Sequence, residues 1–396
     1  MTPTKAPTLT TQSGSYLVSD VTLLLDIVDE SSVANVPVQQ KEALIQSGAQ
    51  HYSDMLTLEQ RPTATHEQLF QQALEQGRTR MATDIANLAY TLHEVFKAKV
   101  TTSVPLILVS LVRAGLPVGV LLQRALSDKT SPYALPSKHY GMSIIRDRGL
   151  DPVAMQTILA QHPDSPIVFI DGWTGKGAIY GELVSSLAIY ADPSNPYYVN
   201  IFHQNQSNND NVIPLVTLAD PAGVAWLAAS NEDWLIPSGL LGSTVSGLIS
   251  RTLFTEPSTD LKEGLHRSVL YHNLIDYDHS LAFIYTIDAA RQQLDLAESS
   301  LTLLPAYQTP RYSTQAIIKS LATRYNIANM NRIKPTIAEA TRALLRRDPE
   351  QVLLATADHP DTVLLRHICT QKNIEVQVLG AEILPYQAVT IIKKRS

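Results

Sequence analysis

The sequence predicts an α/β protein with a doubly wound, mostly parallel sheet, followed by a smaller α/β domain. Short apolar runs without helical period alternate with helical stretches through the middle of the chain, as buried parallel strands and their crossover helices do. The 396 residues exceed an ordinary single domain. The segment 316–396 carries 12 Lys and Arg against 7 Asp and Glu, a net charge of +5, whereas the whole chain has −6. We therefore predict two domains of opposite charge.

The predicted elements are justified in chain order by apolar runs, helical periodicity and Pro or Gly breakers. In the larger domain we expect strands at 21–28, 104–111, 140–145, 167–170 and 197–202, and helices at 67–99, 117–126, 152–160 and 178–190. Residues 254–314 look irregular apart from a helical stretch at 284–303. In the smaller domain we expect helices at 337–347 and 362–370 and strands at 351–355, 375–379 and 387–392.

From these elements we predict that the chain is divided into four parts. Residues 1–15 are rich in Thr and Pro and are expected to be flexible. Residues 16–255 form the parallel-sheet domain, 256–315 a helical connector, and 316–396 the basic domain. Because ligands of such sheets bind at the carboxyl ends of strands, the loops after 110, 145 and 170 are the first places to search for chemistry.

The loop after the strand at 167–170 has the strongest local signal. It runs from a carboxylate, Asp171, through a glycine-punctuated turn into a helix start. The residues expected to hold a phosphate there are Gly172, Thr174, Gly175, Lys176 and Gly177. Glycines let the backbone amides approach an anion, and a hydroxyl and an ammonium add a donor and a charge. A tight turn with an exposed lysine is the alternative interpretation.

Two further loops place arginines at strand ends. Ser110 stands near the end of the strand at 104–111, and Arg113 and Gly115 follow it. Ser110 and Gly115 are expected to bind phosphate, and Arg113 with the Gly115 backbone is a candidate diphosphate clamp because a guanidinium matches phosphate oxygens in bidentate fashion. A turn with a solvated arginine is the alternative interpretation. Arg146 and Arg148 follow another strand. Three such loops on one edge of an acidic domain predict a site for a sugar with phosphate at both ends.

Several of these motifs resemble a known family. The segments SLVRAGLPVG and FIDGWTGKGAI resemble the pyrophosphate and 5-phosphoribosyl-1-pyrophosphate (PRPP) loops of type I phosphoribosyltransferases. Together with SIIRDRG, LADPAG, IPSGLLGSTVSGLISRT and NRIKPTIAEATRALLRR, they are similar to the PRTase-like family also labelled StiP, whose members carry a C-terminal Pelota-type RNA-binding domain. That family is associated with tellurium-resistance and stress gene clusters thought to make a nucleoside-like metabolite.

The resemblance implies a type I PRTase-like fold and phosphoribosyl transfer. Mg²⁺ would be bound with PRPP, the arginines Arg113, Arg146 and Arg148 would stabilise the leaving diphosphate, and Asp171 would orient the ribose. A polar patch of Asn231, Glu232, Ser238, Ser243 and Thr244 resembles the acceptor side, where Asp233 or Glu232 would be the general base. An N-cap and loop cluster is the alternative interpretation of this patch.

The basic domain is similar to Pelota-like and L7Ae-like domains, which meet folded RNA mostly through backbone phosphates. The residues expected to contact RNA are Arg332, Lys334, Arg342 and Arg346. Helix-stabilising charge spacing is the alternative, because Glu339 stands three and seven residues before two of these arginines.

Two rival functions stay open. The StiP label carries the claim of a cysteine protease, whose nucleophile would be the sole cysteine, Cys369. This residue lies in an apolar-periodic helix and its neighbour His367 faces elsewhere, so we predict a buried structural thiol. The second rival is a non-catalytic nucleotide- or RNA-binding protein. We further expect a cytoplasmic, non-membrane protein, no zinc-type cluster, and a homodimer as a candidate assembly.

Overall fold

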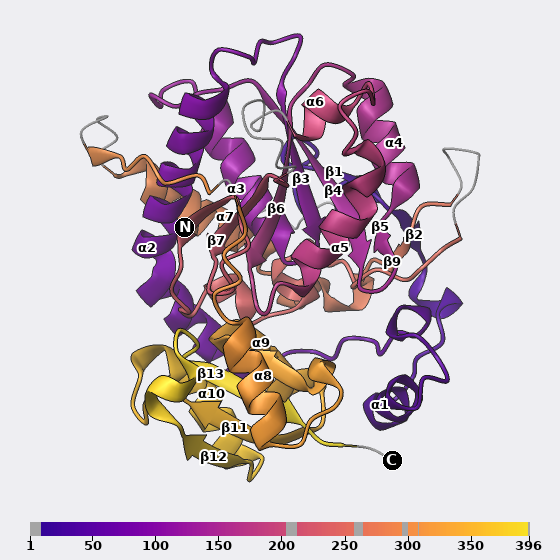
Figure 1. Ribbon diagram of the computed structural model, residues 1–396, viewed down its shortest axis with the longest axis vertical. Helices are drawn as coiled ribbons and strands as arrows, with labels where there is room; N and C mark the ends of the chain where they lie inside the picture. Colours follow the sequence, from indigo (N-terminus) through magenta and orange to yellow (C-terminus); the bar gives the residue numbers. More distant parts are fainter. Residues whose placement is uncertain (1–8, 203–211, 257–263, 295–299, 308, 395–396) are drawn as a thin grey trace.

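The structure is a computed structural model that describes residues 9–202, 212–256, 264–294, 300–307 and 309–394. Figure 1 shows a large α/β domain with a smaller α/β domain packed against one edge of its sheet. The predicted mixed α/β fold, with a mostly parallel central sheet and a separate C-terminal α/β domain, is confirmed. The small domain lies beneath the edge at which the predicted phosphate loops emerge (Figure 1).

The central sheet is parallel along its whole main path. Its strands follow the order β1 (Thr22–Leu24), β4 (Ser137–Ile145), β3 (Leu106–Val112), β6 (Ile167–Trp173), β7 (Leu215–Ala219) and β8 (Leu227–Ser230). The two-residue strand β5 (Gly149–Leu150) runs antiparallel to β4. After β3 the chain moves to one side for β4 and then crosses back to the other side for β6. The ends of β3 and β6 therefore lie at the topological switch point, where ligands of such sheets bind.

Helices cover both faces of this sheet. The helices α2 (Ala64–Phe96), α3 (Gly115–Ser127) and α7 (Ser280–Gln292) bury apolar side chains on one face. The helices α4 (Pro152–Gln161), α5 (Ala178–Leu187) and α6 (Tyr198–Ile201) do so on the other. Helix α4 begins where its sequence predicts, because the Asp151 carboxylate accepts the N–H groups of Val153 and Ala154 and Pro152 tolerates the first helical position.

The small domain has a four-stranded sheet in the order β10 (Ile333–Pro335), β13 (Ala388–Ile392), β11 (Pro349–Leu354), β12 (Glu375–Val378). One face is covered by α8 (Gln315–Arg324), and the other by α9 (Ile337–Arg346) and α10 (Val363–Gln371). Buried side chains of α9 and α10 belong to the same apolar cluster as those of α2 and α3. The two domains thus share a continuous core.

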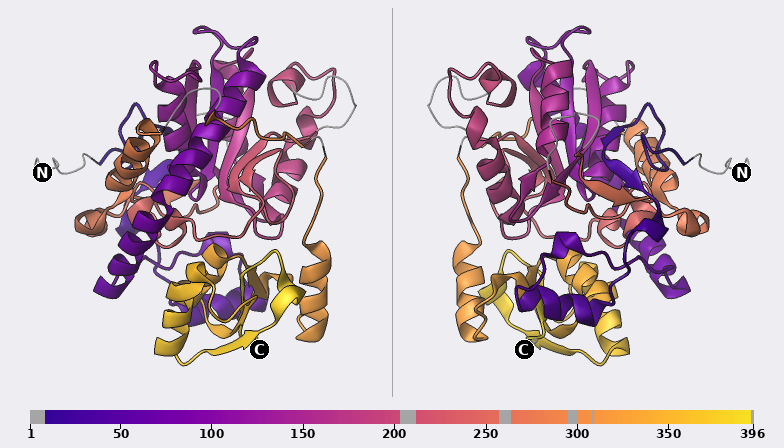
Figure 2. Two further views of the ribbon diagram at one scale, coloured as in Figure 1. Left: turned by 90° about the vertical axis from the view of Figure 1, so that its left-hand side faces the viewer. Right: turned by 90° about the vertical axis from the view of Figure 1, so that its right-hand side faces the viewer.

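A helix from the N-terminal part of the chain also contacts the small domain. Helix α1 (Val38–Gln46) lies beside it in both side views of Figure 2. Glu42 of α1 forms an ion pair with Arg347 just after α9. The Gln46 side chain donates a hydrogen bond to the backbone carbonyl of Lys393. Segments from the N-terminal part of the chain and from the small domain therefore both border the space below the sheet edge.

Some predicted elements differ from those observed. The expected strand at 197–202 is the short helix α6, because the Asn195 side chain accepts the Tyr197 N–H and turns the chain after Pro196. The expected strand at 21–28 is two strands, β1 in the central sheet and β2 (Asp26–Val28), which pairs with β9 (Arg267–Val269). The sequence patterns also missed α1, α8, β5, β7, β8, β9 and β10.

The segments predicted as flexible terminus and connector contain ordered structure. Residues 1–8 lie outside the described residues, but Ser13 and Ser15 are buried and the Ser15 N–H donates to Gly247 O. The segment 256–315 contributes β9 and α7 to the large domain, and its residues 257–263, 295–299 and 308 lie outside the described residues. The helical stretch expected at 284–303 corresponds to α7, which begins and ends earlier.

Candidate anion-binding site

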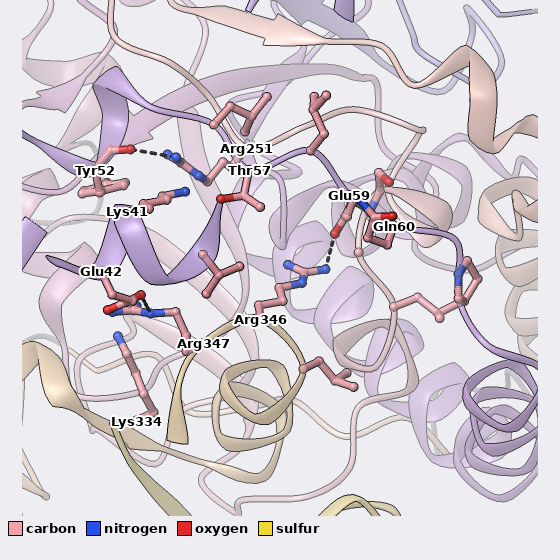
Figure 3. Close-up of a pocket in the computed structure, with 18 of the residues that line it drawn as sticks. Lys41, Glu42, Tyr52, Thr57, Glu59, Gln60, Arg251, Lys334, Arg346 and Arg347 are labelled. Atoms are coloured by element: carbon pink, nitrogen blue, oxygen red, sulfur yellow. Dashed lines mark hydrogen bonds and ion pairs between the residues drawn. The ribbon is translucent and has the colours of Figure 1, made fainter. Parts of the chain in front are cut away.

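A cavity of about 880 Å³ lies between the carboxyl-end edge of the central sheet and the small domain. Its walls come from α1, the segment 48–63, the ends of β3 and β4, the loop around 241–251, and the helices α9 and α10. Figure 3 shows side chains from these elements pointing toward one another across the space. The cavity therefore brings together residues that are up to about three hundred positions apart in the sequence.

The cavity wall is strongly cationic. Among the described residues that line it, nine are Lys or Arg and three are Asp or Glu. The cations are Lys41, Arg61, Arg113, Arg146, Arg251, Lys334, Arg346, Arg347 and Lys372, and the acids are Glu42, Glu59 and Asp147. The wall thus has an excess of six positive charges in a chain whose net charge is negative.

Burial and mutual repulsion lower the pKa values of several of these cations. Burial lowers the pKa of Lys41 to about 7, and the nearby guanidinium groups of Arg251 and Arg347 add to the shift. Burial likewise lowers the pKa of Lys334 to about 8 and that of Arg251 to about 10. Burial is the largest cause of all three shifts, and the Glu339 carboxylate, 3.4 Å from Lys334 Nζ, opposes the shift in the pKa of Lys334.

Some cationic nitrogens in the wall lack hydrogen-bond partners within the described part of the chain. Arg251 donates from Nη2 to the carbonyls of Tyr52 and Met55, but its buried Nη1 is unpaired. Arg146 donates from Nη1 to Asn331 Oδ1 at 2.7 Å, and its buried Nε is unpaired. The Lys41 ammonium forms no ion pair or hydrogen bond with any described residue, although the Lys41 backbone N–H donates to Pro37 O. Buried unpaired donors are unfavourable, so these nitrogens are available for an acceptor.

Two carboxylates pair with three arginines of the wall. Glu42 pairs with Arg347, as the dashed line in Figure 3 shows. Glu59 accepts bonds from Arg113 Nη1 and Nη2 at 2.8 and 2.9 Å and is also paired with Arg346. Burial alone would raise the pKa of Glu59, but Arg113 and Arg346 outweigh it and hold this pKa well below the usual range.

The predicted phosphate loop does not face this cavity, because the small domain covers it. Lys176 Nζ donates to the carbonyls of Met330 and Ile333, the latter at 3.0 Å. The Tyr386 hydroxyl donates to Gly175 O at 2.7 Å. A Cβ atom on Gly175 would lie 2.7 Å from Glu339 Oε2, so the loop and α9 are in close contact. The amides and the ammonium expected to hold a phosphate contact the small domain instead.

Other residues of that loop are engaged within the large domain. Thr174 Oγ1 donates to Asp220 Oδ1 at 2.6 Å and accepts the Ala222 N–H, so its hydroxyl is used twice. The Asp171 carboxylate accepts the N–H of Gly172 at 2.8 Å, and burial raises its pKa to about 7. Gly177 has a φ of +81° at the start of α5, a conformation that favours glycine.

The loop after β3 joins the cavity through Arg113 alone. Ser110 is buried, and its hydroxyl donates to Gly115 O at 3.0 Å and contacts His139 Nε2 at 2.7 Å. A Cβ atom on Gly115 would lie 2.1 Å from Ile170 O, so only glycine lets α3 start this close to β6. Ser110 and Gly115 therefore shape the turn that presents Arg113.

The two arginines after β4 point to different places. Arg146 lines the cavity. Arg148 pairs with Asp54 at 2.6 Å, and its guanidinium lies 4.0 Å from the centre of the Phe254 ring, outside the cavity. Arg113 and Arg146 are thus brought together by the fold, whereas Arg148 and Thr174 are not part of the same wall.

The polar patch predicted on the acceptor side is divided in the same way. Ser243 and Thr244 line the cavity, and the Ser243 N–H donates to Glu59 Oε2 at 2.7 Å. Glu232 pairs with Arg80 at 2.7 Å, and Asn231 Oδ1 accepts a bond from Arg311. Ser238 is buried away from the cavity wall. The cavity wall therefore contains two of the five residues.

Asp233 connects the domains. Its buried carboxylate accepts the N–H of Ile337 at 2.9 Å, which is the first residue of α9, and the N–H of Gln387 at 2.9 Å. Burial raises its pKa to about 7, and these backbone hydrogen bonds act in the opposite direction. A carboxylate at a helix N-terminus is favourable, so this contact stabilises the docked arrangement.

The four residues predicted to contact RNA are turned inward or paired. Lys334 and Arg346 line the cavity. Arg342 donates to Leu241 O and lies 5.0 Å from the centre of the Trp173 ring in the large domain. Arg332 is buried and pairs with Glu350 at 2.8 Å. The basic face of the small domain is thus covered by the large domain.

Cys369 is buried as the sequence predicts. Its side chain is 1% exposed and packs in the apolar cluster with Leu365 and Leu344, and burial raises the pKa of the thiol to about 11. At that pKa about one thiol in ten thousand is ionised at pH 7. His367 is exposed and lines the cavity instead.

The described residues contain neither a metal-binding cluster nor a membrane-spanning helix. No group of three or more His, Cys, Asp or Glu side chains could hold a metal ion in the part of the chain that the structure describes. Over the same residues, no helix is long and apolar enough to cross a membrane.

The fold defines an α/β protein with a parallel-sheet domain and a small basic α/β domain. In comparisons with known proteins, a different family model matches each of these two parts. The model of the family described as "Tellurite-like stress resistance cysteine protease StiP" matches residues 14–288, and that of the "PELOTA RNA binding domain" matches 312–394. The chain is 44% identical over 389 residues to "Cysteine protease StiP" of Acinetobacter baylyi (strain ATCC 33305 / BD413 / ADP1), covering 96% of this chain and 94% of the relative. The chain belongs to the StiP family and carries a Pelota-type domain.

These comparisons correct the predicted function. The prediction of a phosphoribosyltransferase is wrong, because the family and the relative are both named for a cysteine protease and neither is named for a transferase. The expected transfer of a phosphoribosyl group and binding of PRPP are therefore corrected as well. The cysteine-protease alternative has better support than the transferase. Mg²⁺ was expected only as a companion of PRPP and has not been tested.

Several residues of the cavity escaped the sequence analysis. They include Lys41, Glu42 and Glu59. Arg251 and Arg347 lie within the quoted IPSGLLGSTVSGLISRT and NRIKPTIAEATRALLRR segments but are not among the predicted site residues. None of the three stands in a glycine-rich turn or beside a predicted strand end, so no local pattern singles them out. The pairing of isolated acids with distant arginines appears only after folding.

Proposed function

We propose that the chain binds a small phosphorylated ligand, of nucleotide size, in the cavity between its two domains. The observation that carries this proposal is the excess of six positive charges on the described wall of a cavity of about 880 Å³. Ligand pockets commonly measure about 300–1,000 Å³, so the volume suits a nucleotide rather than a single small anion. A ligand with several negative charges would favour the charged forms of Lys41 and Lys334, whose pKa values are lowered mainly by burial.

The kind of cation supports phosphate in particular. Six of the nine cationic residues in the described wall are arginines, whose planar donor sets match phosphate oxygens. Arg113 and Arg146 come from neighbouring strand ends at the edge where ligands of parallel sheets bind. We propose that the large domain is similar to the type I phosphoribosyltransferase fold in the position at which it binds a ligand, and not in the reaction.

RNA is a proposed second partner of the small domain, supported by its match to a Pelota RNA-binding domain. In the docked chain Lys334 and Arg346 line a cavity of about 880 Å³ between the domains, and a folded RNA is too large to fit within that volume. Folded RNA would reach these residues only after the domains separate. A small phosphorylated ligand is therefore the better occupant of the docked cavity.

The first test is calorimetry with ATP and, separately, inorganic pyrophosphate. We expect binding that weakens as salt is raised, and a loss of about tenfold or more in the Lys41→Gln variant, because Lys41 is an unpaired cation of the wall. Arg78→Gln is the matched control, since Arg78 is an exposed cation of α2 paired with Glu75. Absence of heat with both probes at low salt in the wild type would overturn the proposal.

A second candidate function, a cysteine protease, is favoured by the names of the family and the relative. If this chain is a protease, its nucleophile is Cys369, because the sequence has no other cysteine. A thiol protease needs a thiolate activated by a nearby histidine. In the structure the thiol is buried with a raised pKa, and His367 is exposed on another face of α10. Activity through Cys369 would require α10 to move out of the core.

The protease candidate makes a separate prediction. Cys369→Ala should abolish thiol-dependent cleavage of an unfolded protein substrate such as casein, whereas His367→Ala should lower it if that histidine is the base. Circular dichroism and the thermal midpoint check that each variant is folded. We expect ATP binding to survive Cys369→Ala, since the thiol does not line the cavity. Cleavage that persists in this variant would exclude Cys369 as a nucleophile.

A further inference from the structure

One carboxylate in the cavity is held by an unusually complete set of donors. Glu59 accepts two bonds from the Arg113 guanidinium, at 2.8 and 2.9 Å, and one from the Ser243 N–H at 2.7 Å. It is also paired with Arg346 of α9, as Figure 3 shows. Two guanidinium groups and a backbone amide therefore surround one carboxylate. We call Arg113, Arg346 and the Ser243 N–H the arginine cradle.

The cradle has more charge than its occupant. Two guanidinium groups face a single carboxylate, so one positive charge is left over at this point of the wall. The mutual repulsion of the two arginines is visible in Arg346, whose pKa is lowered by burial and by Arg113, although Glu59 opposes the shift. A dianionic phosphate would neutralise the cradle completely, and guanidinium forks bind phosphate as readily as carboxylate.

The backbone leaves room for an anion at this point. Gly242 lies against the Glu59 carboxylate, and a Cβ atom there would stand 1.8 Å from Glu59 Oε1 and 2.0 Å from Arg346 Nη2. The next amide, that of Ser243, points at the carboxylate. The cradle is therefore built from a side-chain clamp on one side and an open glycine backbone on the other, as phosphate sites commonly are.

Glu59 reaches the cradle from a segment without regular structure. The residues between the turn at Tyr52–Asp54 and the start of α2 are neither helix nor strand. The neighbouring residues of this segment are held by hydrogen bonds: the Thr57 hydroxyl donates to Val36 O, the Leu58 N–H to Asn35 Oδ1, the Val36 N–H to Leu56 O and Arg251 to Met55 O. The Glu59 side chain can therefore leave the cradle without breaking an element of secondary structure.

We infer that the arginine cradle is a phosphate subsite and that Glu59 is its internal occupant, which a phosphate group of the ligand displaces. This inference rests on the proposed function and adds to it the position of one phosphate and the residue that competes with it. The cradle joins β3 of the large domain to α9 of the small one, so a phosphate that replaces Glu59 keeps the two domains connected.

The experiment compares the affinity of inorganic pyrophosphate for the wild type and for Glu59→Gln. The amide keeps the shape of the side chain but removes the charge that competes with phosphate, so we expect binding to tighten about tenfold or more. Glu42→Gln is the matched control. It removes the same charge from the same wall, but from a carboxylate that pairs with Arg347 outside the cradle. We expect it to tighten binding less than about threefold.

A second measurement tests the same displacement through the thermal stability of a variant that lacks the Glu59 carboxylate. Glu59→Ala leaves the two arginines without a counter-ion, so its thermal midpoint should be lower than that of the wild type. Pyrophosphate should raise that midpoint more in Glu59→Ala than in the wild type, because it refills the cradle. Equal midpoint shifts in both proteins would contradict the displacement.

The outcomes separate this inference from the proposed function. Pyrophosphate binding that depends on Lys41 but is unchanged or weakened in Glu59→Gln would overturn the displacement by Glu59 and leave the cavity as an anion site. No binding in the wild type, in Glu59→Gln or in Glu59→Ala would overturn both.

Discussion

Replacing Asp233 by alanine is expected to separate the small domain from the large one. The buried Asp233 carboxylate accepts the N–H groups of Ile337 and Gln387, which belong to the small domain. Without it, two backbone donors at the interface lose their acceptor, at about 1–3 kcal/mol each. We therefore expect docking to weaken by on the order of 2–6 kcal/mol, which raises the population of the open arrangement.

Calorimetric unfolding and hydrogen exchange measure this change. We expect one unfolding transition in the wild type and two in Asp233→Ala, with faster exchange of the amides at the start of α9. Glu232→Ala is the matched control, because it removes the adjacent carboxylate, which is exposed and paired with Arg80 at the surface. A single transition at the wild-type midpoint in Asp233→Ala would show that Asp233 does not hold the domains together.

Separation should also expose the basic face of the small domain. Lys334, Arg342 and Arg346 contact the cavity or the large domain in the docked chain. We expect Asp233→Ala to bind a folded RNA hairpin more tightly than the wild type, with an affinity that falls steeply with salt. An opened variant that binds RNA no better than the wild type would remove RNA from the partners proposed for this face.

The parts of the site that sequence could predict are those encoded locally. An apolar run that ends in a polar turn marks a strand end, so Arg113 and Arg146 were placed at the correct edge of the sheet. Parallel strands place such ends side by side without any knowledge of the rest of the chain. The same reasoning located Cys369 in the core, because the apolar residues around it recur with helical period.

The hydrogen-bond partner of each polar group could not be predicted in this way. Thr174 is in a turn that looks able to hold a phosphate, but its hydroxyl is taken by Asp220, 46 residues later. Lys176 has the expected charge, but its ammonium contacts carbonyls more than 150 residues away. A local pattern shows which donors exist and not which are already satisfied, and the latter depends on how the domains dock.

ATP binding at pH 8 is expected to take up about one and a half protons from the solvent. Lys41, with a pKa of about 7, is mostly neutral at this pH, and Lys334, with a pKa of about 8, is half protonated. The phosphates of ATP, already ionised because their last pKa is about 6, would raise both pKa values and so bring protons onto the amines. The affinity should therefore rise as the pH falls from about 9 to about 7.

Calorimetry in two buffers of different ionisation enthalpy measures the uptake. Lys41→Gln should reduce it to about half a proton, which is the share of Lys334, and should flatten the pH dependence of the affinity. Lys319→Gln is the control, since Lys319 is exposed on α8, away from the cavity. Heats that do not depend on the buffer, or a release of protons, would mean that ATP does not bind beside these lysines, because phosphate oxygens in that position must favour their charged forms.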